Sequence, residues 1–244
     1  MKKRRTNSQF WQGKQVKVEI PFSRAGVAQQ IWIESATGSV LIDAGDGTLR
    51  DLVSVGVDLD KLKGIIFTHG HFDHVGGLHS LLGFLRMIGR KEVLTICAPK
   101  GCAEVFSIVD NFARLCRDTV PFRICLREIE PQEVFQMAEM KIKPFSVLHC
   151  GSIEGVGILD PVPALGYRIS HKGEAIAITG DTGFCPSLKE LVKGVDLAII
   201  EATHQNSKDV DRETLEKVHL SEDLAKEIGK LAKGFILVHR GAGE

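Results

Sequence analysis

One ten-residue segment constrains this chain more than any other. Residues 68–77 read THGHFDHVGG and directly follow the apolar run at 64–67, so three imidazoles and a carboxylate fall within six positions at the end of an expected buried strand. Packing so many polar groups at a strand end is costly unless they hold an ion. Because zinc and similar metals prefer nitrogen and oxygen ligands, the segment predicts a metal site.

The spacing of these side chains favours two ions. His69 and His71 lie two positions apart in an extended stretch and can point to one ion, whereas Asp73 and His74 turn toward a second. Three further candidates each end an apolar run, and these are His149, Asp181 and His239. The two oxygens of Asp181 can bridge two cations. The prediction is therefore a dinuclear site in which one ion is held by His69, His71 and His149, the other by Asp73, His74 and His239, and Asp181 bridges them.

The expected cofactors are two divalent metal ions. Zinc is the expected metal, with manganese or iron as alternatives, because mixed nitrogen and oxygen sites select poorly by affinity alone. The six cysteines include no C-x-x-C pair, which argues against a zinc ribbon or a disulfide framework.

Short apolar runs alternate with longer segments of helical spacing, which predicts an α/β fold. The expected strands are 31–34, 39–43, 64–68, 93–97, 122–129, 140–148, 165–170, 174–179, 195–200 and 235–238, and the expected helices are 48–55, 78–88, 187–192 and 222–233. The 244 residues show no repeat and no linker, so we expect a single domain over 1–244, with 1–15 as a flexible basic tail.

Charge and hydropathy exclude two classes of partner. Lys and Arg together number 31, as do Asp and Glu, so no protein-wide basic field would attract nucleic acid. No apolar run approaches the ~20 residues of a spanning helix, and no apolar segment follows the basic N-terminus as in a signal peptide. We expect a cytoplasmic protein without a membrane partner.

The motif H-x-H-x-D-H, with the later His149, Asp181 and His239, resembles that of the metallo-β-lactamase superfamily of hydrolases. This resemblance extends from about Ile31 to His239. It implies a four-layer αββα sandwich with the dinuclear site at one edge of the sheets. It also implies that Asp43, in the segment LIDAGDGT, orients metal ligands.

Within that superfamily, three segments resemble the ribonuclease Z-like branch of phosphodiesterases: VPALGYRI at 162–169, IEAT at 200–203, and HLSEDLAKEIGKLAK from His219. The resemblance implies a phosphodiesterase or endonuclease in which a metal-bridged hydroxide attacks the phosphorus. Glu201 and His219 would supply a proton to the leaving oxygen, and Asp73 would orient the hydroxide. Related enzymes often form dimers, so a homodimer is a further expectation.

The segment between His149 and Asp181 distinguishes this chain from ribonuclease Z. Only 31 residues, 150–180, separate the two ligands, which is too few for the long arm that grips tRNA in that family. We expect a loop over 151–163 that forms a wall of the substrate pocket. The expected substrate is a small phosphodiester or an RNA end.

Two other functions remain open at this stage. The same metals could hydrolyse a thioester, lactone or sulfate ester, although the expected pair of Glu201 and His219 favours a phosphodiester. A binding protein that has lost catalysis is the other alternative, and the complete set of seven ligands argues against it.

Overall fold

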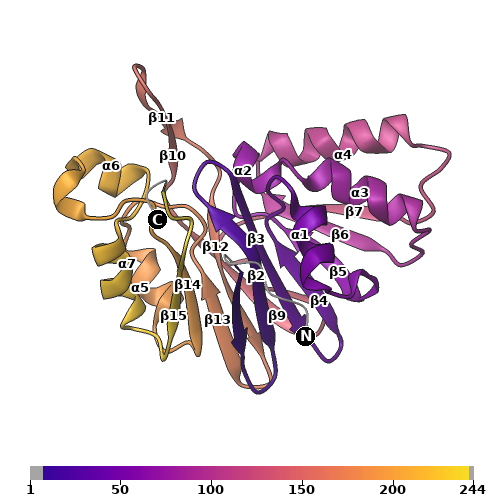
Figure 1. The fold of residues 1–244 in the computed structure, drawn as a ribbon, viewed down its shortest axis with the longest axis horizontal. Coiled ribbons are helices and arrows are strands. Elements are labelled where there is room, and N and C mark those ends of the chain that lie inside the picture. Colours follow the sequence, from indigo (N-terminus) through magenta and orange to yellow (C-terminus); the bar gives the residue numbers. More distant parts are fainter. Residues whose placement is uncertain (1–7, 242–244) are drawn as a thin grey trace. The chain divides into compact units, whose positions relative to one another are not determined.

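The computed structural model describes residues 8–241, and the chain divides into two units (Figure 1). The described part of the first unit comprises residues 8–128 and 137–139, and that of the second comprises 129–136 and 140–241. Each unit contains one large sheet and its own helices.

The first sheet has seven strands in chain order. These are β1 (Gln9–Gln12), β2 (Lys17–Arg24), β3 (Ala28–Ser35), β4 (Gly38–Ile42), β5 (Leu62–Ile66), β6 (Leu94–Pro99) and β7 (Ile124–Ile129). Strands β1 to β4 pair antiparallel, whereas β4, β5 and β6 run parallel. Because parallel strands end at the same edge, the residues after β4 and β5 are brought together.

Helices bury one face of this sheet. They are α1 (Thr48–Val55), α3 (Leu78–Met87) and α4 (Ala103–Leu115), and a single turn, α2 (Phe72–Val75), precedes α3. Leu52 of α1, Leu82 of α3 and Phe112 of α4 share one apolar cluster with strand residues such as Ile65 and Ile96. This core fixes the ends of β4 and β5.

The second unit has a six-stranded sheet in the order β15-β14-β13-β12-β9-β8. The bounds are β8 (Phe135–Met137), β9 (Met140–Ser146), β12 (Leu165–His171), β13 (Glu174–Ile178), β14 (Leu197–Glu201) and β15 (Phe235–Val238). Strands β13, β14 and β15 run parallel, so the residues that follow them lie at one edge of this sheet.

The helices of this unit are α5 (Ser187–Val192), α6 (Arg212–Lys217) and α7 (Glu222–Gly229). A short 3₁₀ turn lies at Ser207–Asp209, and the first unit has another at Leu59–Lys61. Leu188 of α5 and Ala225 of α7 belong to one apolar cluster with Ala177 and Ala198 of the sheet. Helices α5 and α7 thus cover a face of the six-stranded sheet.

A separate two-stranded hairpin follows β9. It consists of β10 (Cys150–Ile153) and β11 (Gly157–Pro161), which project away from the six-stranded sheet in Figure 1. The sequence predicted a loop over 151–163, and this prediction was wrong. Gly155 and Gly157 adopt positive φ angles of 77° and 104°, which allow the tight reversal that pairs the two strands.

Two other predictions differ from the structure. The strand expected at 122–129 begins two residues later, as β7, and is the last strand of the first sheet, where the Leu94 N–H donates to the Arg123 carbonyl at 2.9 Å. Helix α7 ends at Gly229, four residues before the expected end at Lys233.

The expected basic tail at 1–15 lies partly outside the described residues, since 1–7 are not described. Its remaining part is not a tail, because Gln9–Gln12 form β1 on the edge of the first sheet. Phe10 and Trp11 are aromatic residues that favour a strand. The Nζ atom of Lys17 in β2 lies 5.7 Å from the centre of the Phe10 ring, which joins β1 to its neighbour.

Over residues 8–241, no helix is both long and apolar enough to cross a membrane.

Candidate functional site

The first cluster of candidate ligands follows β5 and belongs to the first unit. His69 and His74 are fully buried, Asp73 is buried, and His71 is partly exposed. The ring centres of His69 and His74 lie 4.1 Å apart, and those of His69 and His71 lie 4.7 Å apart. The structure therefore brings together the three imidazoles of the HGHFDH segment.

Asp43 organises this cluster from the end of β4. Its Oδ1 accepts the Thr68 N–H at 2.8 Å, and its Oδ2 accepts both the Thr68 hydroxyl and His74 Nδ1 at 2.8 Å. Asp43 has a φ of +59°, a left-handed conformation that Asp tolerates better than most residues. The resemblance implied that Asp43 orients a ligand, and the hydrogen bond to His74 has that geometry.

Thr68 extends the same network to His69. Its hydroxyl donates to Asp43, so it accepts from His69 Nδ1 at 3.1 Å. The hydrogen bonds to Asp43 and Thr68 therefore place the protons of His74 and His69 on Nδ1. Each Nε2 keeps the lone pair that a metal requires.

Asp73 meets the turn between β2 and β3. The Gly26 N–H donates to Asp73 Oδ2 at 2.9 Å, and Gly26 has a φ of +66° that favours glycine. One carboxylate oxygen of Asp73 is thus held by backbone, which limits rotation of the group.

The second cluster lies at the edge of the six-stranded sheet. His149 comes after β9, Asp181 after β13 and His239 after β15, and all three are buried. Asp181 Oδ2 lies 3.3 Å from His239 Nε2 and 4.0 Å from His149 Nε2. One oxygen of Asp181 therefore faces two imidazole nitrogens.

The far sides of these two imidazoles are also held. His149 Nδ1 donates to the Val218 carbonyl at 2.8 Å, and His239 Nδ1 lies 3.0 Å from the Thr203 hydroxyl. His239 has a φ of +52°, a left-handed conformation that is uncommon for residues other than glycine. Both Nε2 atoms are thus directed to Asp181.

Glu201 is the most heavily hydrogen-bonded carboxylate of the second unit's site. It ends β14 and is buried. Its Oε1 accepts from His219 Nδ1 at 2.9 Å and from the N–H groups of Thr182 and Leu220 at 3.1 Å. Its Oε2 accepts from the N–H and hydroxyl of Thr203. These donors fix the position of the carboxylate.

His219 is the exposed member of the pair, with 18% of its side chain accessible. Because Nδ1 donates to Glu201, Nε2 carries the lone pair of the neutral ring. The ring centre of His219 lies 5.1 Å from that of His149 and 5.4 Å from that of His239. The imidazole of His219 thus stands beside candidate ligands of the same unit.

The donor set fits divalent metal ions. In the second unit, one ligand atom each from His149, Asp181 and His219 lie within 4.8 Å of one another. In the first unit, two imidazoles are buried with Nδ1 already committed to protein partners. Buried, oriented imidazoles and carboxylates are the arrangement by which proteins hold zinc and related metals.

The neighbouring thiols differ from metal-binding thiolates. Burial raises the pKa of Cys102 to about 12, and Glu104 adds to this effect. Burial also raises the pKa of Cys150, which follows His149 in the chain. Both groups therefore stay protonated near neutral pH.

The imidazole of His204 is also affected by its surroundings. Burial lowers the pKa of His204, and His219 adds to this effect.

Three contributors were absent from the predictions. Thr68, Thr203 and the turn at Gly26 hold candidate ligands or Glu201 through hydrogen bonds. The threonines lie next to residues of interest in THGHFDH and IEAT, so their positions were a usable signal. The contact of Gly26 with Asp73 spans 47 positions in the chain and leaves no local pattern.

Comparison with known proteins gives a consistent family. The model of the β-lactamase superfamily domain matches residues 39–239. The chain is 27% identical over 243 residues to the ribonuclease Z of Pyrococcus abyssi (strain GE5 / Orsay), and the match covers 83% of this chain and 76% of the relative.

Solved structures agree with this match at the level of the fold. The metallo-β-lactamase fold protein YhfI from Bacillus subtilis superposes with a TM-score of 0.72 at 19% identity, covering 94% of this chain and 87% of the other. The short form of human tRNase Z gives a TM-score of 0.76 at 22% identity, and the match covers 92% of this chain and 93% of that one. The metallo-β-lactamase fold predicted from the sequence is confirmed by this likeness.

Proposed function

Since the chain belongs to the β-lactamase superfamily, we propose that it is a metal-dependent phosphodiesterase that resembles ribonuclease Z and acts on small diesters or RNA ends. The observation that carries this proposal is the pair of Glu201 and His219, joined at 2.9 Å. Cleavage of a phosphodiester expels an alkoxide, which requires a proton, and an imidazole held by a buried carboxylate can supply it.

Seven side chains would hold two divalent ions. They are His69, His71, Asp73 and His74 from the first unit, and His149, Asp181 and His239 from the second. Zinc is the proposed metal, with manganese or iron as alternatives. When bound, such ions supply Lewis acidity, which polarises phosphoryl oxygens and lowers the pKa of water. The supporting observation is that four of the imidazoles have Nδ1 engaged by protein.

The side chains of this protein would perform the remaining steps. Asp73, with one oxygen held by Gly26, would accept a hydrogen bond from the attacking water and orient it toward phosphorus. His219 would donate the proton from Nε2 to the leaving oxygen. Glu201 would keep the imidazole in the correct tautomer and stabilise its charged form.

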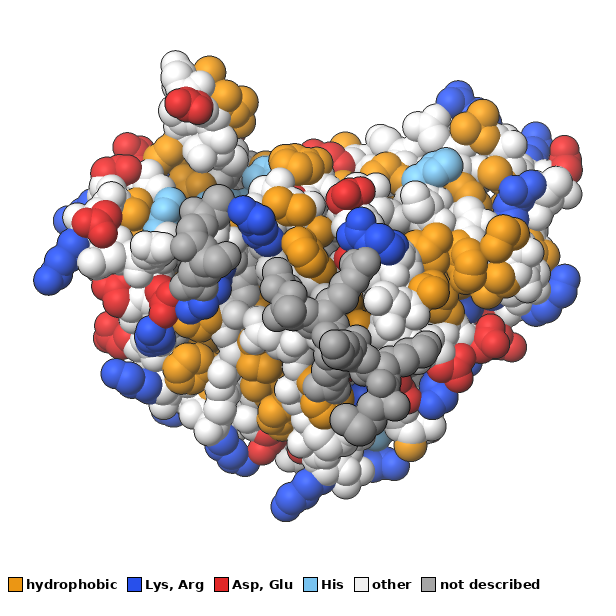
Figure 2. Space-filling model, viewed as in Figure 1, with side chains coloured by type: hydrophobic (Ala, Val, Ile, Leu, Met, Phe, Trp, Pro, Cys, Tyr) orange, Lys and Arg blue, Asp and Glu red, His pale blue; other side chains and the backbone are white. Residues whose placement is uncertain are grey.

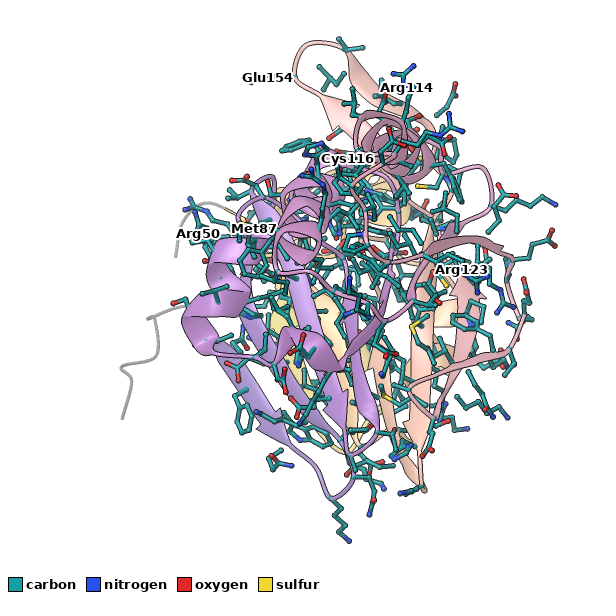
Figure 3. All side chains as sticks on the ribbon, turned by 90° about the vertical axis from the view of Figure 1, so that its right-hand side faces the viewer. Arg50, Met87, Arg114, Cys116, Arg123 and Glu154 are labelled. Carbon is teal, nitrogen blue, oxygen red and sulfur yellow. The ribbon has the colours of Figure 1, made fainter. Side chains whose placement is uncertain are left out.

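The hairpin of β10 and β11 supports a small substrate. Its residues, 150–161, include Glu154 and Asp160 but no Lys or Arg. Figure 3 shows Glu154 at the tip, and in Figure 2 the projecting hairpin carries orange and red side chains but no blue ones on the face shown. Since tRNA gains most of its affinity from phosphate contacts, this hairpin would not act as an RNA-binding arm.

A substrate panel tests the proposed function. Protein loaded with zinc or manganese is assayed on bis(p-nitrophenyl) phosphate, a thioester, a lactone and an aryl sulfate. We expect turnover of the phosphodiester and its loss on chelation. Preferential hydrolysis of any of the other esters would overturn the proposed bond specificity, and no turnover of any compound by metal-loaded protein would favour a binding function.

A further inference from the structure

Phe72 is the most exposed aromatic side chain beside the candidate ligands. It begins α2, lies between His71 and Asp73 in the chain, and is 68% exposed. Asp73 and His74 occupy the inward directions of this turn, which leaves only the solvent side for Phe72. The aromatic ring therefore stands directly outside the first cluster.

The turn that carries this ring is anchored by two hydrogen bonds to Ala44. The Ala44 N–H donates to the His74 carbonyl at 2.7 Å, and the Gly77 N–H donates to the Ala44 carbonyl at 2.8 Å. These bonds tie α2 to the segment after β4. Phe72 thus projects from a rigid base, as a binding platform requires.

The turn between β2 and β3 lies next to this platform, because Gly26 contacts Asp73. The turn exposes Arg24 and Val27. Among the described residues, no carboxylate forms an ion pair with Arg24. In Figure 1 this turn and α2 lie at the same end of the first sheet. Asp73 is therefore followed outward by a turn that exposes one cation, Arg24, and one apolar group, Val27, and it is preceded in the chain by the exposed Phe72.

We propose that Phe72 stacks against a nucleobase and makes nucleoside-bearing phosphodiesters the preferred substrates. The inference rests on the proposed function and specifies its substrate class. An aromatic ring presents a π-face that any base can cover, and such stacking is tolerant of base identity. Arg24 adds a positive charge for the phosphate of the same nucleotide.

A pair of substrates with one leaving group tests this inference. The p-nitrophenyl ester of thymidine 5′-phosphate and ethyl p-nitrophenyl phosphate both release nitrophenolate, but only the first carries a base. We expect Phe72→Ala to raise KM for the thymidine ester about tenfold or more, the range of one base–aromatic stack. KM for the ethyl ester should change less than about twofold, because it shares the nitrophenyl ring of the thymidine ester but carries no base to stack.

Three further variants separate stacking from other effects. Phe72→Tyr keeps the π-face and should retain the low KM, whereas Phe72→Leu is apolar without a π-face and should behave as Phe72→Ala does. Met87→Ala is the matched control, since Met87 is 70% exposed and belongs to α3 of the same unit (Figure 3). It should change neither KM.

Binding of the product gives a readout independent of turnover. Calorimetry with thymidine 5′-phosphate should show a weaker Kd for Phe72→Ala than for the unaltered protein, with no such difference for ethyl phosphate. Equal KM changes for both esters, or equal Kd values, would overturn the stacking role while leaving the proposed function in place. If the unaltered protein hydrolyses neither ester, the proposed function fails, and the Kd comparison still decides whether Phe72 stacks a base.

Discussion

Asp43 connects two imidazoles of the first cluster. It accepts directly from His74 Nδ1, and it reaches His69 through the Thr68 hydroxyl. Replacing it by asparagine keeps the size of the side chain but supplies an amide that cannot accept on both sides. Loss of such an orienting carboxylate lowers metal affinity by about 10- to 100-fold in comparable sites. We expect this loss for Asp43→Asn in zinc titrations against a competing chelator.

The matched control is Asp46→Asn, because Asp46 is exposed in the same loop. It should leave zinc affinity unchanged. Equal affinities of Asp43→Asn and the unaltered protein would show that Asp43 serves the backbone of this loop and not the metal.

His219 permits a test that depends on the leaving group. Nitrophenolate departs without a proton, whereas an alkoxide requires one. His219→Ala should therefore slow hydrolysis of an alkyl diester by about 10²-fold or more, the range of general acid catalysis, and slow a nitrophenyl diester much less. The measurement is kcat on both substrates, with His79→Ala, an exposed residue of α3, as control. Equal losses on both substrates would reduce His219 to a positioning residue.

The candidate ligands could be read from the sequence because each follows an apolar run. The hydrogen bonds that orient them could be read only in part. Asp43 was identified from its motif, but Thr68 and Thr203 are small residues whose hydroxyls gain a role only once β4 meets β5 and β14 meets β15. Non-local pairing of strands creates these contacts.

At the scale of elements, patterns of apolar residues predicted the bounds of a helix or strand correctly where a clear signal marks its end. Helix α1 has the predicted bounds Thr48–Val55, and Gly56 ends it with a φ of 77°. Helix α5 and strand β15 also have their predicted bounds. Helix α4 was missed, although Val105, Val109 and Phe112 have helical spacing, because no capping residue marks its start at Cys102.

Helix α3 offers a matched pair of glycines with opposite expected effects. Gly83 lies inside the helix and Gly89 lies just beyond its end with a φ of +73°, and an added methyl group would meet no atom within 4 Å at either position. Gly83→Ala should stabilise the protein by about 0.5–1 kcal/mol, because alanine favours a helix. Gly89→Ala should destabilise it by about 1–2 kcal/mol, because it strains a left-handed residue.

Thermal unfolding of both variants measures this difference. About 1 kcal/mol should shift Tm by roughly 2–4 °C in a chain of this size. Shifts of the same sign at Gly83 and Gly89 would contradict the assigned ends of α3.

At the scale of the whole molecule, the proposed ligands are divided between two units of one chain. Ions that bind the folded chain and not the unfolded one stabilise it by about 2.7 kcal/mol at a concentration a hundred times Kd. This corresponds to a rise in Tm of about 5–11 °C. We expect elemental analysis of the purified protein to give close to two ions per chain. The rise in Tm is expected when zinc is added back to protein stripped by a chelator. We also expect one unfolding transition, as the proposed single domain over 1–244 requires.

Asp181→Ala tests whether the stabilisation comes from the proposed dinuclear site, because Asp181 is the proposed bridge between the two ions. It should lose most of the zinc-dependent rise in Tm. Absence of transition metal from freshly purified protein, together with no uptake on titration, would contradict the proposed dinuclear site.

The charge of the molecule bears on substrate size. With a net charge of zero and an acidic hairpin after His149, the chain has no overall excess of basic residues to attract a folded RNA. We expect efficient cleavage of small diesters and poor cleavage of a pre-tRNA 3′ trailer. The measurement is kcat/KM for both at physiological salt. Efficient, site-specific trailer removal would overturn the small-substrate proposal.

The β10–β11 hairpin also indicates how such a chain could diversify. Its two ends are paired across the register from Cys150 to Pro161, so residues added at the tip would leave this base unchanged. Each doubling of an inserted loop costs only about 0.6 kcal/mol in closure entropy. A lineage could therefore gain or lose a long appendage here, and with it a macromolecular substrate, by insertion at the tip while its hydrolytic residues stay as they are.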